Sequence, residues 1–82
     1  CLALAYEAMR QGGNMPCVLN AANEVVNEAF RHGKCSFLDM GNIIEKTMQR
    51  VSYDKSSQYQ IYVDTDAETR RVAEEMVHEL RR

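Results

Sequence analysis

The side chains best suited to metal binding or covalent catalysis in this chain are Cys17, His32, Cys35 and His78. His32 and Cys35 have the H-x-x-C spacing that supplies half of a zinc site. A zinc site needs two spaced pairs of ligands, and the sequence contains one. A cysteine nucleophile needs a base and an orienting group around a cleft, for which so short a chain has little room. We therefore interpret these residues as ordinary thiols and imidazoles, and we expect no catalytic or metal-binding residue.

Two pairs of carboxylates recur at helical spacing, Glu24 with Glu28 and Glu75 with Glu79. Neither pair has a histidine or another metal ligand beside it, so we interpret both as solvated helix faces. The glycine pair at 12–13 lacks the spacing of the glycine-rich loops that bind phosphates. We accordingly expect no cofactor-binding residue in this chain.

Three asparagines, Asn20, Asn23 and Asn27, fall at i, i+3 and i+7 and so lie along one side of a helix. Asparagine is unfavourable inside helices because its side chain competes for backbone hydrogen bonds. Compared with alanine, the three together cost about 1–2 kcal/mol of helix stability. Two explanations are open: a plain solvated face, or amides that bind loop carbonyls, another helix end or a second domain. These asparagines are our candidate interdomain contact.

Length and charge restrict the class of protein. A chain of 82 residues has room for one domain, and it buries too little surface to be more than marginally stable by itself. Ten Lys and Arg against twelve Asp and Glu give a net charge of −2, and the basic residues are scattered along the chain. A free-standing nucleic-acid binder is normally basic on one face. We therefore expect no nucleic-acid partner and disfavour a helix-turn-helix DNA reader.

Neither a membrane span nor a signal peptide is expected. No apolar run reaches roughly 18–20 residues, and the first residues lack the basic start of a signal peptide. The three cysteines are an odd number, which fits reduced thiols in the cytoplasm better than a disulfide framework. The chain begins at Cys1 and not at Met, which indicates processing or a fragment of a longer protein.

Periodic apolar residues predict two helices in the first half of the chain. The first spans about residues 2–10 and ends at the glycines and asparagine of 12–14. The second spans about residues 17–32, follows Pro16 and ends at Gly33. The apolar sides are predicted to be Leu2, Ala5, Tyr6 and Met9 in the first helix, and Val18, Leu19, Ala22, Val25, Val26, Ala29 and Phe30 in the second.

The third helix has two possible starts. Ser36 and Asp39 fit a capping box, whereas Asp39 as the N-cap would pair Leu38 with Ile43 in a hydrophobic staple. We prefer Asp39, because that start keeps Gly41 in the first turn, where glycine costs least. The apolar side of this helix is predicted to be Met40, Ile43, Ile44, Thr47, Met48 and Val51.

The polar residues 52–60 predict a loop, and the apolar run 61–63 predicts a short extended segment under the bundle. The last helix is expected to begin near Asp64 or Thr65, because Thr65 and Glu68 match a capping box. Its inner side is predicted to be Ala73, Met76, Val77 and Leu80. The predicted fold class is all-α: a small four-helix bundle-like domain with a polar loop before the last helix. Residues 1–82 are predicted to form a single helical domain.

The asparagine-rich segment carries a family resemblance. Residues 19–25 read L-N-A-A-N-E-V, which resembles a motif of the 1-deoxy-D-xylulose 5-phosphate reductoisomerase family. The similarity continues through the family's A-F and G-x-I-x-F-x-D-I patterns, and the first and last helices are similar to the ends of its C-terminal region. The matching residues are Ala29, Phe30, Gly33, Phe37 and Asp39, and the departures are Asn27, Cys35, Met40 and Gly41. Gly41 falls where many members have proline, which again favours Asp39 as the cap.

The resemblance implies that residues 1–82 are the C-terminal helical domain of a longer enzyme. That family converts 1-deoxy-D-xylulose 5-phosphate to 2-C-methyl-D-erythritol 4-phosphate in the non-mevalonate route to isoprenoids, using NADPH and a divalent metal, Mg or Mn. The resemblance further implies that no catalytic, metal or cofactor residue lies in this segment, which alone is inactive. Its partner would be the catalytic domain of the same chain, in a parent enzyme that is a homodimer. The alternative is a free-standing helical protein-interaction module.

Overall fold

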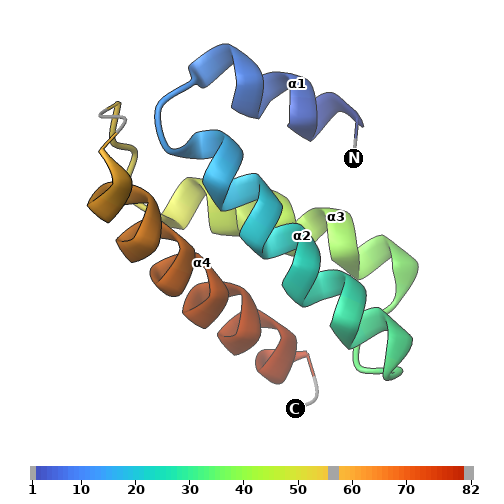
Figure 1. Ribbon diagram of the computed structural model, residues 1–82. Coiled ribbons are helices and arrows are strands. Elements are labelled where there is room, and N and C mark those ends of the chain that lie inside the picture. The colour runs from blue at the N-terminus through green and yellow to red at the C-terminus, as the bar shows by residue number, and fades with distance from the viewer. Residues whose placement is uncertain (1, 56–57, 81–82) are drawn as a thin grey trace.

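Helix α2 (Met15–Arg31) is the element on which the other helices pack in the computed structural model, which describes residues 2–55 and 58–80 (Figure 1). Helix α1 (Leu2–Gln11) runs back along α2. Helices α3 (Phe37–Arg50) and α4 (Tyr59–Glu79) pack on α2 and on each other. The described residues contain these four helices and no strand, which confirms the all-α, four-helix prediction.

The core lies where α2, α3 and α4 meet. Val26 of α2, Ile44 of α3 and Ala73 of α4 are completely buried there. Alanines at the contacts let the helix axes approach closely, and the aliphatic side chains fill the space between them. The buried hydrophobic cluster is Ala8, Met15, Val18, Ala22, Val26, Ala29, Ile43, Ile44, Val51, Val72, Ala73, Met76 and Val77. Most of the predicted apolar sides of the last three helices are therefore confirmed.

Helix α4 begins earlier than predicted. It starts at Tyr59, after a loop whose residues 56–57 lie outside the described part, so the apolar run 61–63 is helical and not extended. Thr65 is not an N-cap, since it is buried inside the helix and its hydroxyl accepts a hydrogen bond from Asn14 Nδ2 at 3.1 Å. β-branched residues favour strands only weakly, and packing of this segment against α2 outweighs that preference.

Helix α3 begins at the start that we did not prefer. Ser36 is the N-cap: its Oγ accepts from the Asp39 backbone N–H at 3.1 Å, and its own N–H donates to Asp39 Oδ2 at 2.9 Å. Leu38 is exposed, so it forms no staple with Ile43 in the core. The capping box satisfies two backbone donors that a start at Asp39 would leave to solvent, which explains why it is formed.

Several predicted inward-facing side chains point outward instead. Tyr6 and Met9 of α1 are exposed, because Ala8 and Leu4 form the side that packs on α2. The side chain of Leu2 lies outside the described part. Phe30 is also exposed and contacts Phe37 edge-to-face, with ring centroids 6.4 Å apart. Leu80 is exposed at the C-cap of α4.

The turn between α1 and α2 is fixed by Asn14. Gly12 and Gly13 have positive φ angles of 68° and 56°, which glycine adopts without strain, as the predicted helix stop requires. The Asn14 side chain then reaches the loop before α4. Its Nδ2 donates to Ser52 O at 2.8 Å, and its Oδ1 accepts from Asp54 N at 2.8 Å. This asparagine ties the first turn of the domain to the segment between α3 and α4.

Candidate contact surface on the second helix

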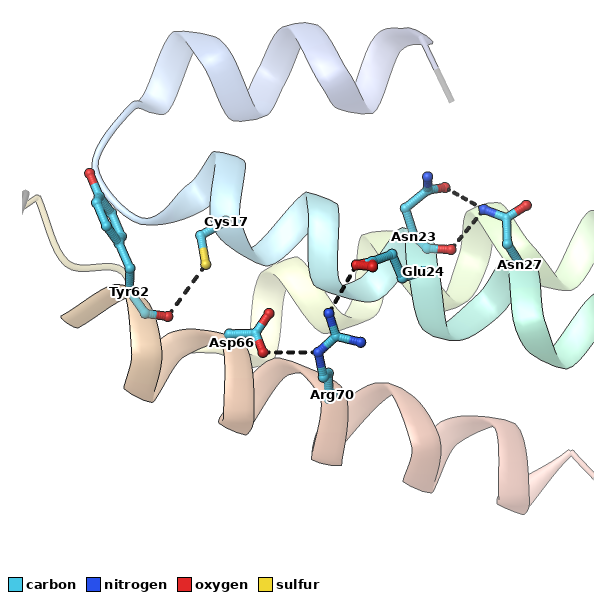
Figure 2. A network of polar contacts seen from close by, with 7 residues as sticks. All are labelled: Cys17, Asn23, Glu24, Asn27, Tyr62, Asp66 and Arg70. Carbon is cyan, nitrogen blue, oxygen red and sulfur yellow. Dashed lines mark hydrogen bonds and ion pairs between the residues drawn. The ribbon is translucent and has the colours of Figure 1, made fainter. Parts of the chain in front are cut away.

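The three predicted contact asparagines lie along the solvent side of α2. Asn20 and Asn23 are exposed and Asn27 is half-buried. Asn27 Nδ2 donates to Asn23 O at 2.7 Å and to Asn23 Oδ1 at 3.1 Å (Figure 2). The structure therefore brings Asn23 and Asn27 together. The Asn20 amide makes no hydrogen bond to another described residue, so it is open to water or to a partner.

The side of α2 next to the asparagines is joined to α4 by an ion-pair network. Arg70 of α4 donates from Nη2 to Glu24 Oε2 and from Nε to Asp66 Oδ2, each at 2.9 Å. The hydrogen bond that Arg70 donates to Asp66, followed by the one that it donates to Glu24, raises the pKa of Arg70 above its ordinary value. In Figure 2, Glu24 points toward α4 whereas Asn23 and Asn27 point away from it. The asparagines thus lie beside the contact between α2 and α4, and Asn23 and Asn27 line the hollow between these two helices.

Three of the four carboxylates in the predicted pairs lie beside basic side chains on the surface. Glu24 is bound by Arg70, and Glu75 Oε1 accepts from Arg71 Nη1 at 2.9 Å. Glu28 Oε1 lies 3.8 Å from His32 Nε2. Exposed pairs of this kind contribute about 0–1 kcal/mol each. Pairing with basic neighbours leaves these carboxylates as surface groups and gives them no arrangement suited to acid–base chemistry.

The thiols of Cys17 and Cys35 are protected by burial. Both are half-buried, and Cys17 Sγ donates to Tyr62 O at 3.6 Å while Cys35 Sγ donates to Val26 O at 3.7 Å. Burial raises the pKa of each thiol above its ordinary value, which keeps the unreactive protonated form.

The two histidines, His32 and His78, line a hollow that neither Cys17 nor Cys35 lines. This hollow lies between α2 and α4 and has a volume of about 970 Å³. Across residues 2–55 and 58–80, no three His, Cys, Asp or Glu side chains gather closely enough to hold a metal ion. In the described part of the chain, His32 and Cys35 therefore have no further His, Cys, Asp or Glu side chains placed to complete a metal site with them.

The sequence pattern does not identify two side chains that join distant segments of the domain. Asn14 was interpreted as part of a helix stop, and Arg70 as an outward-facing residue of the last helix. The partners of Asn14 are 38 to 51 positions away in the sequence, and Glu24 is 46 positions away from Arg70. The spacing of residues along one helix carries no signal for contacts at such separations.

Comparison with known proteins agrees with the motif on α2. The model of the family described as DXP reductoisomerase C-terminal domain matches residues 1–72, which is most of the chain. The chain belongs to this family. It is 62% identical over 72 residues to the 1-deoxy-D-xylulose 5-phosphate reductoisomerase of Phocaeicola vulgatus, covering 88% of this chain and 19% of that protein.

Two further reductoisomerases give the same result. The Bacteroides thetaiotaomicron protein is 58% identical over 76 residues, which is 93% of this chain and 20% of the relative. The Acetivibrio thermocellus protein is 47% identical over 77 residues, or 94% of this chain and 20% of the relative. The chain thus spans about a fifth of the length of the curated reductoisomerases that it matches. Within the described residues, no helix is long and apolar enough to cross a bilayer.

Proposed function

We propose that residues 1–82 are the single C-terminal helical domain of a reductoisomerase. This enzyme would convert 1-deoxy-D-xylulose 5-phosphate to 2-C-methyl-D-erythritol 4-phosphate in non-mevalonate isoprenoid biosynthesis, with NADPH and Mg or Mn. The observation that carries the proposal is the family match over residues 1–72, together with 62% identity to a reductoisomerase. The comparison covers about a fifth of the relatives' length, so the whole-enzyme activity is inferred from the family.

The role proposed for this domain is structural. Burial raises the pKa of the Cys17 and Cys35 thiols, which favours their protonated form, and the surface carboxylates Glu24 and Glu75 are bound by arginines. These side chains do not fit a metal or dinucleotide site, because a cation needs unpaired carboxylate or imidazole ligands. We assign NADPH and metal binding to the remainder of the enzyme chain, in a homodimer in which this domain braces the catalytic domain.

The activity assignment is tested by NADPH oxidation in the full-length enzyme. We expect consumption that depends on both 1-deoxy-D-xylulose 5-phosphate and Mg or Mn. We expect the 82-residue chain alone to show no turnover above background. Lack of substrate-dependent oxidation by the full-length enzyme contradicts the proposed function, and turnover by the isolated chain contradicts the structural role.

The asparagine surface is the proposed contact with the catalytic domain. Asn20 and Asn23 have exposed amides, and asparagine lowers the stability of a helix. In the described part of this domain, the hydrogen bonds between Asn23 and Asn27 are the ones that these amides make. We expect the Asn20→Ala/Asn23→Ala double variant to lower the unfolding free energy of the full-length enzyme by about 1–3 kcal/mol, because buried interdomain hydrogen bonds are lost. Asn42→Ala, at an exposed asparagine of α3, is the matched control. Unchanged or improved activity and stability in the double variant would rule out this contact.

A further inference from the structure

Helix α1 carries large apolar side chains on its outer side. Ala8 is fully buried and Leu4 packs on the core, whereas Tyr6 and Met9 are 71% and 72% exposed. Residues three apart lie next to each other on a helix, so Tyr6 and Met9 form one apolar patch, here called the α1 outer face. We propose that the α1 outer face packs against the part of the reductoisomerase chain that precedes this domain. This inference rests on the proposed function.

The polar groups beside the α1 outer face are already paired within the helix. Arg10 Nε donates to Glu7 Oε1 at 3.2 Å, and Gln11 Nε2 donates to Glu7 Oε2 at 2.8 Å. The hydrogen bonds from Arg10, and then from Gln11, lower the pKa of Glu7 below its ordinary value. The charges are therefore satisfied without a charged partner, and an apolar surface can approach without leaving an unpaired ion.

Packing on one side leaves α1 with little support. A ten-residue helix is marginal in water by itself, and most helix stability in proteins comes from packing. A partner that covered Tyr6 and Met9 would bury two large side chains. The resulting hydrophobic free energy would stabilise α1, which packs on one side in the isolated domain. The position of α1 at the edge of the domain, across α2 from α4, leaves room for a second layer on this face (Figure 1).

The preceding chain is the occupant that the family match favours. The matched region is a C-terminal domain that accounts for 19% to 20% of the relatives' length, so most of each relative precedes it. Helix α1 is the first element of the domain, so the preceding chain would join the domain at the N-terminal end of α1 (Figure 1). A segment tethered within two helical turns of Tyr6 and Met9 has a high effective concentration at this face, so weak packing is enough to hold it there.

A second exposed apolar cluster provides an internal control. Leu38 is 81% exposed beside Phe37, near the turn between α2 and α3, and this turn lies at the end of α2 remote from the α1–α2 turn (Figure 1). In the domain, the exposed fraction of Leu38 (81%) is higher than that of Met9 (72%). A difference in accessibility between the two positions in the full-length enzyme must therefore come from residues outside the domain.

The proposal is tested by thiol labelling of the full-length reductoisomerase. Met9→Cys and Leu38→Cys are made separately, with Tyr6→Cys as a second position on the α1 outer face. Each variant is treated with iodoacetamide, and peptide mass spectrometry follows the new thiol separately from the native cysteines. The rates are compared as thiolate rate constants obtained from labelling over a range of pH, because position 38 lies in the first turn of α3, where a helix N-terminus makes a thiol more acidic. We expect the thiolates at positions 6 and 9 to react at least about tenfold more slowly than the thiolate at position 38, because packing excludes the reagent.

Two results would overturn the proposal. The first is equal reactivity at positions 6, 9 and 38 in an enzyme that oxidises NADPH, which would show that the α1 outer face is free in the working enzyme. The second is protection that disappears on dilution, which would assign the face to a second copy of the chain. Absence of substrate-dependent NADPH oxidation in the parent enzyme is the separate result that contradicts the proposed function.

Discussion

At the scale of single residues, Asn14 makes contacts that its neighbours in the sequence do not predict. Its side chain is almost completely buried and bridges Ser52, Asp54 and Thr65. Its backbone N–H also donates to Asp54 O at 2.8 Å. An amide that donates and accepts at once suits this position, since aspartate lacks the donor and alanine lacks both groups.

Replacement of Asn14 by alanine is expected to destabilise the domain by about 2–3 kcal/mol, because it removes the hydrogen bond to the buried Thr65 hydroxyl and two hydrogen bonds to part-buried backbone groups of the 52–54 loop. The measurement is the free energy of unfolding from urea denaturation. Asn42→Ala, at an exposed asparagine of α3, should change stability by less than about 0.5 kcal/mol. Equal effects at positions 14 and 42 would show that the bridge contributes nothing to stability.

Gly13 combines a left-handed backbone with a close approach of another segment. A Cβ at this position would lie 2.5 Å from Asp54 O, whereas a Cβ on Gly12 would meet nothing within 4 Å. Both residues have positive φ. We expect Gly12→Ala to cost about 1 kcal/mol from backbone strain alone. Gly13→Ala should cost about 1–3 kcal/mol more, since backbone must move to relieve the overlap. Equal melting temperatures for the two variants would contradict this account.

At the scale of elements, the start of α3 depends on the reciprocal Ser36 and Asp39 bonds. The Ser36 backbone N–H, and then its hydroxyl, lower the pKa of the Asp39 carboxyl below its ordinary value of 3.8. A carboxyl group whose pKa is lower in the folded than in the unfolded protein stabilises the fold at pH values above its pKa in the unfolded protein. That stabilisation is lost as pH falls through the folded value.

Two variants test this cap. Ser36→Ala is expected to lower the free energy of unfolding by about 1 kcal/mol at neutral pH. Asp39→Asn should remove part of the stability loss that the parent shows as pH falls from neutrality to below 3.8. The measurement is urea denaturation across that pH range. An acid dependence that is identical in the parent and in Asp39→Asn would show that the box does not form in solution.

At the scale of the whole molecule, stability depends on a small core shared by α2, α3 and α4. Ile44 is completely buried in that core, and Leu38 on the same helix is exposed. Ile44→Ala is expected to cost about 2–5 kcal/mol, from lost burial and from the cavity that it leaves. Leu38→Ala should change stability by less than about 0.5 kcal/mol. Thermal unfolding of the two variants provides the comparison, and similar losses would contradict the packing described for α3.

The periodicity of apolar residues was sufficient to predict the four helices and most of the core. Ile43, Ile44 and Thr47 recur at helical spacing, and each is buried as predicted. Such patterns work because a helix that packs on one side must repeat its apolar residues every three or four positions. The same reasoning failed for α1, because that helix has apolar residues on two sides and the pattern does not tell which side packs.

Local patterns in the chain were enough to predict the fold class and the family, because helical periodicity and the motif at residues 19–25 each lie within a short stretch of sequence. The tertiary structure alone decided that α4 begins at Tyr59, that Arg70 joins α4 to Glu24 on α2, and that the α1 outer face is exposed. Each of these depends on contacts between segments far apart in the chain. Packing free energy exceeds the small differences in local propensity that a sequence pattern records.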